Sequence, residues 1–155
     1  MDERMSPRRL YLDTSVYNRP FDGLSQPRVW LEALAFAVIL QMIESDDVQI
    51  ISSKVLEFEN SRNPLPYRKA WVSFYLRLAK DFQELNESIR KRAQGLESQR
   101  LEPIDALHLA CAEEAKAEYF ITCDDRIIKR YQAETLRVMS PVDFVIEEVQ
   151  GDGGD

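Results

Sequence analysis

The residues best suited to chemistry in this chain are carboxylates placed at the ends of apolar runs or at the start of helices. Asp13 closes one short apolar run, Asp124 follows another, and Asp105 lies in the first turn of a strongly helical segment. Packed carboxylates repel one another unless a cation neutralises them, and hard divalent cations prefer oxygen ligands of this kind. If the fold brings these acids together, they predict a Mg²⁺ or Mn²⁺ site.

A further acid follows the second apolar run, where Glu57 and Glu59 lie in one helical segment. Only one of the two can face the same crevice as the other acids, because side chains two residues apart point in different directions from a helix. Both can equally be solvated acids on a helix surface. Asp105 has an alternative role as well, since a helix dipole favours an acid in the first turn.

The remaining acids can be judged as helix caps. One of Asp124 and Asp125 can cap the helix that follows them. Asp13 is harder to explain in this way, because a cap there requires a helix to begin at once, and the segment TSVYNRP at 14–20 looks like a loop. Asp13 is therefore the strongest single candidate for a ligand.

The elements that must position these acids alternate between short apolar runs and helical patterns, which predicts an α/β fold. Five strands separated by helices indicate a three-layer α/β/α sandwich around a mainly parallel sheet, with ligands bound at the carboxyl ends of the strands. Ser53 is a good N-cap for the helix after the second strand. The expected strands are 10–13, 48–52, 81–86, 118–122 and 135–140, and the expected helices are 27–45, 53–62, 67–80, 87–99, 103–117, 123–131 and 141–149.

The long helices carry many apolar side chains. The pattern of helix 27–45 places one apolar face on Trp30, Leu34, Ala37, Val38 and Met42. The apolar faces near 28–42 and 67–80 are suited either to the core or to contact with a second copy, so we expect a homodimer.

Composition limits the function classes. The 155 residues are 45% hydrophobic, which is enough for one domain, expected at 9–148 between a disordered N-terminus (1–8) and a flexible tail (149–155). A net charge of −7 argues against a general basic surface for nucleic acid. No run approaches the roughly 18 apolar residues of a membrane span, and the N-terminus has no secretory pattern. The two isolated cysteines suit free thiols. We therefore expect a cytoplasmic protein.

Several segments, in the order found here, resemble the motifs of PIN-domain nucleases, and the similarity extends from about Arg9 to Glu147. These segments are YLDTSVY, SSKVLEFE, EPIDALHLACAEEAKAEYFITCDDRII and VMSPVDF. Within the family, small prokaryotic members are the most similar, among them the toxins of toxin–antitoxin pairs. The resemblance implies metal-dependent hydrolysis of RNA phosphodiesters, an RNA substrate and an antitoxin protein as partner.

The resemblance also assigns roles to individual residues. The family's four acids fall on Asp13, Glu59, Asp105 and Asp124 as catalytic metal ligands, with Glu57 as the alternative to Glu59 because that register depends on spacing alone. Thr122, Ser15 and Asp125 are expected to support these ligands by hydrogen bonds. Asn18 and Arg126 are the expected substrate contacts. His108 lies one helical turn beyond Asp105, where it could orient a carboxylate or simply be a half-buried helix residue.

Two functions from different classes remain open on the sequence. The first is a Mg²⁺- or Mn²⁺-dependent endoribonuclease, and the second is a catalytically inactive PIN-like binding or scaffold protein. The acids serve as ligands in the first case and as caps and solubilising charges in the second. A phosphatase of the haloacid-dehalogenase type is disfavoured because Ser15 stands where its second acid is needed.

Overall fold

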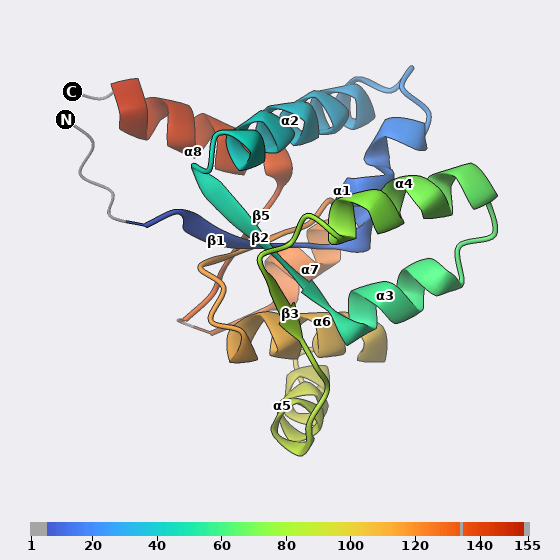
Figure 1. Cartoon of the computed structure of the whole chain (residues 1–155). Coiled ribbons are helices and arrows are strands. Elements are labelled where there is room, and N and C mark those ends of the chain that lie inside the picture. Colours follow the sequence, from blue (N-terminus) through green and yellow to red (C-terminus); the bar gives the residue numbers. More distant parts are fainter. Residues whose placement is uncertain (1–5, 134, 154–155) are drawn as a thin grey trace.

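The computed structural model describes residues 6–133 and 135–153, and it contains one parallel sheet between two layers of helices (Figure 1). All pairings in the sheet are parallel, and the strand order is β3-β2-β1-β4-β5. The predicted three-layer α/β/α fold is therefore confirmed. The strands are β1 (Arg8–Leu12), β2 (Val48–Ser53), β3 (Asp81–Gln83), β4 (Tyr119–Ile121) and β5 (Arg137–Met139).

The helices cover both faces of this sheet, with α2 and α8 packed together on one side and α6, backed by α5, on the other (Figure 1). Pro occupies the first helical position of α2, α4 and α6, where its missing N–H is not needed. The bounds are α1 (Thr14–Asn18), a 3₁₀ turn η1 (Arg19–Phe21), α2 (Pro27–Glu44), α3 (Lys54–Ser61), α4 (Pro66–Leu76), α5 (Glu87–Glu97), α6 (Pro103–Glu114), α7 (Asp125–Arg130) and α8 (Pro141–Gly153).

The order in which strands are added to the sheet reverses at its centre, and this switch point creates the place for a site. From β1 the chain adds β2 and β3 on one side, and then returns to add β4 and β5 on the other. The loops after β1 and β4 therefore leave adjacent strands at the same edge and turn to different faces, which is the usual position of a ligand crevice in such sheets. Asp13 and Asp124 follow these two strands.

The core lies on both faces of the central strands. Leu10, Leu12, Ile50 and Phe120 are fully or almost fully buried, as expected for a parallel sheet covered by helices on each side. Cys111 and Cys123 are also buried and unpaired, as expected for free thiols. Within the described residues, no helix has both the length and the apolar character that a membrane crossing requires.

The structure corrects the prediction of a loop directly after Asp13. Helix α1 begins at Thr14, and the carbonyl of Asp13 accepts the backbone N–H of Val16 at 2.9 Å. Burial of Val16 and Tyr17 supports this one-turn helix. Five residues are too few to show helical periodicity, so the sequence pattern could not indicate it.

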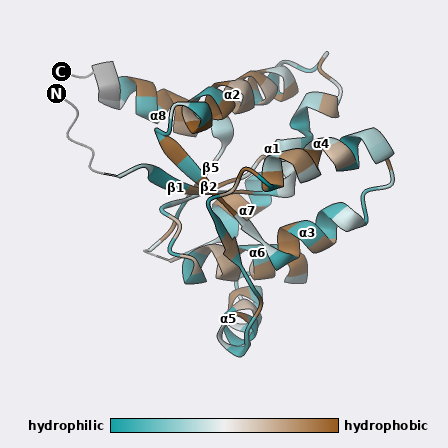
Figure 2. Cartoon of the chain, viewed as in Figure 1, coloured by the Kyte–Doolittle hydropathy of each residue, from teal (hydrophilic) through white to brown (hydrophobic). Residues whose placement is uncertain are grey.

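The apolar face predicted for helix 27–45 is not the face that packs into the core. Trp30, Leu34 and Val38 are exposed, whereas Phe36 and Ile39 are buried. Figure 2 shows hydrophobic residues along the whole of α2. Because α2 is apolar around most of its circumference, periodicity alone could not decide which side faces the sheet.

At the ends of the domain, β1 begins one residue before the expected boundary, and α8 continues through Gly153 into the segment expected as a flexible tail. Residues 1–5 and 154–155 of the two expected terminal segments lie outside the described residues. The domain limits of 9–148 therefore stay a prediction.

Candidate functional site

Asp13 occupies the N-cap position of α1, but its carboxylate is not used for capping. Oδ2 instead accepts hydrogen bonds from Thr122 Oγ1 at 2.8 Å and from Ser15 Oγ at 3.0 Å. The side chain is only 6% exposed. Two hydroxyls from different segments therefore hold a buried carboxylate in a fixed orientation. The role of Thr122 and Ser15 as supports of a metal ligand stays a prediction.

The structure separates Glu59 from Glu57. Glu59 Oε1 accepts a hydrogen bond from Thr14 Oγ1 at 2.8 Å and lies 2.7 Å from His108 Nε2. Burial raises the pKa of Glu59, but the hydrogen bond and the charge of His108 outweigh burial and hold it below its ordinary value. Glu57 is exposed, with an oxygen 3.9 Å from Lys54 Nζ, and lies outside the cavity that Glu59 lines.

Asp105 enters the site from the first turn of α6, on the opposite face of the sheet from α2. Burial, together with the neighbouring charges of Asp13, Asp124 and Glu59, raises its pKa to about 6 against the opposing effect of His108. Within the described residues, its carboxylate has no hydrogen bond or ion pair. An acid held among other acids without a neutralising partner is typical of a cation site.

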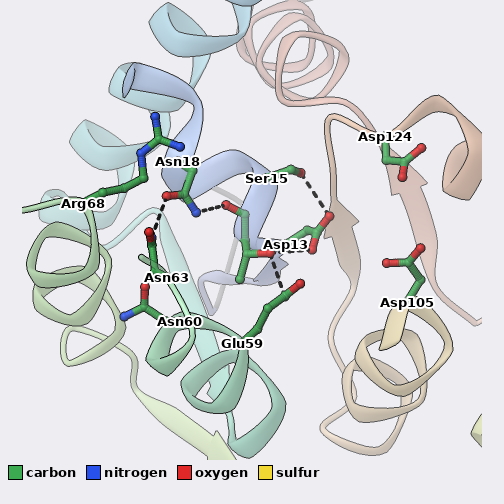
Figure 3. A pocket seen from close by; sticks show the side chains of 10 residues that line it. Asp13, Ser15, Asn18, Glu59, Asn60, Asn63, Arg68, Asp105 and Asp124 are labelled. Carbon is green, nitrogen blue, oxygen red and sulfur yellow. Dashed lines mark hydrogen bonds between the residues drawn. The ribbon is translucent and has the colours of Figure 1, made fainter. Parts of the chain in front are cut away.

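Asp124 combines a structural role with a place in the site. Its carboxylate caps α7 by accepting the backbone N–H of Arg126 at 2.9 Å, and it also pairs with the Arg126 guanidinium at 3.1 Å. Burial raises the pKa of Asp124, but these bonds to Arg126 outweigh burial and lower it. The alternative of a capping acid therefore applies to Asp124, while Figure 3 shows its carboxylate beside that of Asp105.

These acids line one open cavity of about 410 Å³ at the carboxyl edge of β1 and β4. In Figure 3, Asp105 and Asp124 form one wall, Asp13 and Glu59 lie across from them, and a polar wall of amide and guanidinium groups completes the cavity. The lining residues are Asp13, Thr14, Ser15, Asn18, Glu59, Asn60, Asn63, Arg68, Asp105 and Asp124. The structure thus brings the four predicted acids to one place, together with Asn18.

Two of the predicted supporting and substrate residues, Asp125 and Arg126, do not line the cavity. Asp125 lies outside the cavity lining, where it binds the Arg28 guanidinium through two hydrogen bonds of 2.6 and 2.7 Å. Arg28 also pairs with Glu32, a residue only 1% exposed, and Glu32 pairs with Arg19 at 2.7 Å. This chain of ion pairs joins η1, α2 and α7. Arg126 is paired with Asp124 and is not among the lining residues.

The sequence interpretation missed part of the cavity. Asn60, Asn63 and Arg68 come from the end of α3, the following turn and the start of α4, a segment with no motif of its own. Arg68 Nη2 donates to the carbonyl of Phe21 at 2.9 Å, and its guanidinium lies over the Phe21 ring. Only the folding of α4 against α1 and η1 places this cation at the cavity.

His108 is the other residue whose role the sequence left open. It is 1% exposed, and its two ring nitrogens contact Glu59 and the hydroxyl of Tyr11, each at 2.7 Å. Ligand atoms of Asp13, Glu59 and His108 all lie within 4.8 Å of one another. Because both nitrogens of His108 are engaged, the oxygen atoms of the carboxylates are the donors best placed for a cation. Oxygen donors suit Mg²⁺ or Mn²⁺.

Comparisons with known proteins agree with this geometry. No curated protein sequence matches the chain. Among solved structures, the fold is similar to a chain of VapBC2 from Rickettsia felis, which was solved bound to a DNA fragment from their promoter. The TM-score is 0.56 and the sequence identity is 11%, and the similarity covers 84% of this chain and 96% of that one. The family model for the PIN domain matches residues 10–133. That match covers every acid of the cavity, and the chain belongs to the PIN-domain family.

Proposed function

We propose that this protein is a metal-dependent endoribonuclease that hydrolyses RNA phosphodiesters at its four-carboxylate site, and that it acts as the toxin of a toxin–antitoxin pair. The observation that carries the proposal is the convergence of Asp13, Glu59, Asp105 and Asp124 on one cavity. Members of the PIN-domain family are generally nucleases, which makes phosphodiester hydrolysis the reaction that best fits such a site.

The four carboxylates would hold the cation, Mg²⁺ or Mn²⁺. When bound, such an ion stabilises negative charge that develops on a phosphate and makes water easier to deprotonate. Thr122 and Ser15 keep the carboxylate of Asp13 in one orientation, and Thr14 does the same for Glu59. The protein's own contribution is therefore to hold two of these oxygen ligands, Asp13 and Glu59, in fixed orientations.

The polar wall supplies the contacts for substrate. Asn18 is held by a bond from its Nδ2 to the Thr14 carbonyl at 2.9 Å, and its Oδ1 accepts a hydrogen bond from Asn63 at 3.3 Å. Arg68 lies on the same side of the cavity (Figure 3). A cation beside amides suits a phosphate with its attached nucleotide. The Arg68 guanidinium, which also pairs with Asp22 at 3.5 Å, would supply positive charge locally despite the net charge of −7.

The structural similarity to a VapBC2 chain supports an antitoxin protein as partner, and a cytoplasmic location is part of the same proposal. A homodimer is supported by the exposed apolar side of α2, which carries Trp30, Leu31 and Leu34.

Cleavage of a mixed RNA pool tests the proposal. With Mg²⁺ or Mn²⁺ we expect endonucleolytic cleavage that EDTA abolishes, together with a rise in melting temperature on addition of the metal. Asp13→Asn should remove both effects, and Glu57→Gln is the matched control because Glu57 lies outside the cavity. Absence of cleavage and of metal-dependent stabilisation in the unaltered protein would instead favour an inactive binding module.

A further inference from the structure

A buried chain of hydrogen bonds runs from the start of α3 to the carboxylate that α3 carries into the cavity. Ser53 Oγ lies 2.7 Å from the Tyr11 hydroxyl, which lies 2.7 Å from His108 Nδ1, and His108 Nε2 lies 2.7 Å from Glu59 Oε1. Ser53, Tyr11 and His108 are each at most 1% exposed. The chain crosses from β2 to β1 to α6 and returns to α3, so it joins segments that are distant in the sequence.

The direction of this chain follows from Glu59. An ionised carboxylate can only accept hydrogen bonds, so the proton of the His108–Glu59 bond must reside on Nε2. In a neutral ring, Nδ1 is then the acceptor, and the Tyr11 hydroxyl donates to it; in a charged ring both nitrogens donate, and Nε2 still donates to Glu59. Ser53 Oγ can donate to Tyr11 while it accepts the backbone N–H of Leu56 at 3.0 Å. Every polar group in the chain has a partner in this arrangement.

The ring of His108 is also held by its surroundings. It contacts Tyr11 edge to face with ring centroids 5.7 Å apart, and Tyr11 in turn stacks on Phe120 at 5.3 Å. These contacts restrict rotation of both rings, which are buried in the core. His108 therefore presents its Nε2–H from a rigid part of the core.

Both hydrogen bonds to Glu59 end on the same oxygen. Thr14 Oγ1 donates to Oε1 at 2.8 Å, and His108 contacts Oε1 at 2.7 Å, whereas within the described residues Oε2 has no hydrogen bond. The side chain of Glu59 is 36% exposed, so without these bonds it would sample several rotamers. The two bonds keep one oxygen occupied and the other one available.

We propose that His108 is a positioning residue for cation binding, which orients Glu59 so that its second oxygen faces the cavity, and that the contact with Tyr11, itself bonded to Ser53, holds the His108 ring in place. This inference rests on the proposed function, because it assumes that Glu59 is a ligand. Hydrogen bonds to the far side of a ligand are a common way to fix its geometry, and their loss typically lowers metal affinity about 10- to 100-fold.

Two substitutions of His108 separate orientation from packing. The amide nitrogen of His108→Gln can take the place of Nε2 and donate to Glu59, whereas the shorter side chain of His108→Asn reaches only the position of Nδ1, beside Tyr11. Mn²⁺ binding to each purified protein is measured by calorimetry, and RNA cleavage is measured over a range of Mn²⁺ concentrations. We expect His108→Asn to weaken Mn²⁺ binding about 10- to 100-fold. His108→Gln should bind Mn²⁺ with nearly unaltered affinity. At saturating Mn²⁺, the kcat values of the two variants should be similar.

A second measurement needs no substitution in the core. His108 is the only histidine of the chain, so the ¹⁵N imidazole spectrum of the metal-free protein contains one pair of ring signals. We expect the signal of Nε2 to show an attached proton. A spectrum in which Nε2 is unprotonated and only Nδ1 carries hydrogen would overturn the proposal, even if the substituted proteins failed to fold.

The outcomes distinguish this inference from the proposed function. If the unaltered protein binds Mn²⁺ and His108→Asn binds it equally well, the positioning role is refuted and the metal site stands. If His108→Gln loses affinity to the same extent as His108→Asn, the effect comes from packing and the positioning role is again refuted. If the unaltered protein binds no Mn²⁺, the proposed metal site fails, and the positioning role fails with it.

Discussion

The raised pKa of Asp105 predicts that the carboxylate site destabilises the metal-free protein. In the unfolded chain this acid ionises with an ordinary pKa of 3.8, and in the folded protein its pKa is about 6. Between these values the folded state keeps a proton that the unfolded state has released. Stability therefore falls as the pH rises through this window, and above about pH 6 the penalty is fully present.

The size of the penalty follows from the shift. A rise of about two pKa units corresponds to at most about 3 kcal/mol, since each unit is worth about 1.4 kcal/mol. Asp105 is partly exposed, and solvent screening reduces this to roughly 1–2 kcal/mol. We expect Asp105→Asn to stabilise the metal-free protein by that amount at pH 8, which is about 2–8 °C in melting temperature for a domain of this size.

Urea unfolding in EDTA from pH 4 to pH 8 measures the effect directly. The unaltered protein should lose stability between about pH 4 and pH 6 relative to Asp105→Asn, and the difference should stay constant above pH 6. Asp143→Asn is the matched control, because Asp143 is also an acid in the first turn of a helix but is exposed and away from the cavity. That change should leave stability unaltered or slightly reduced.

Addition of Mn²⁺ should reverse the order. A site that binds Mn²⁺ stabilises the folded state by about 2.7 kcal/mol at a hundred times Kd, and Asp105→Asn should gain much less. The reasoning is refuted if Asp105→Asn is no more stable than the unaltered protein at pH 8 in EDTA. It is equally refuted if the two proteins show the same pH dependence between pH 4 and pH 6.

Three further predictions concern other parts of the molecule. Arg68→Gln should raise KM for RNA several-fold and leave kcat nearly unchanged, because the cation lies in the polar wall and contributes to substrate binding. Steady-state cleavage kinetics measure both constants, and an unchanged KM would contradict this prediction. Glu32→Gln should lower the free energy of unfolding by about 2 kcal/mol. This loss is smaller than for a fully buried pair, because Arg19 and Arg28 are partly exposed. Urea unfolding measures it, and a loss below about 0.5 kcal/mol would argue against the chain of ion pairs. Leu34→Glu should convert a homodimer to a monomer without loss of stability, because Leu34 is exposed. Analytical ultracentrifugation measures this change. An unchanged sedimentation coefficient would exclude this side of α2 as the dimer contact.

The amino-acid sequence by itself determined the order of the strands and of the longer helices, and which side chains were candidates for the site. Strands rich in apolar residues between amphipathic or Pro-initiated helices can pack in few ways other than as a covered parallel sheet. Asp13 and Asp124 were recognisable because they directly follow apolar strands, and Asp105 because it opens the helix that precedes another strand. Ser53 was recognisable as a cap for the same kind of local reason.

Only the tertiary structure decided the questions that depend on direction. Glu59 and Glu57 are two residues apart in one helix, and their roles differ because α3 turns one of them toward Thr14 and His108. The apolar surface of α2 covers most of its circumference, so the packing of α8 and the sheet, and not periodicity, selects its buried side. The one-turn helix after Asp13 depends on burial of Val16 and Tyr17, which no local pattern reveals.

The same limit applies to the groups that surround the carboxylates. Arg68 and Asn63 reach the cavity because α4 packs against α1, and Tyr11, Ser53 and His108 form one chain only after three separate segments have come together. A sequence states which side chains can coordinate or donate. Their partners are set by contacts between distant segments, because hydrogen bonds and ion pairs act over only a few ångströms and depend on where the folded chain places each atom.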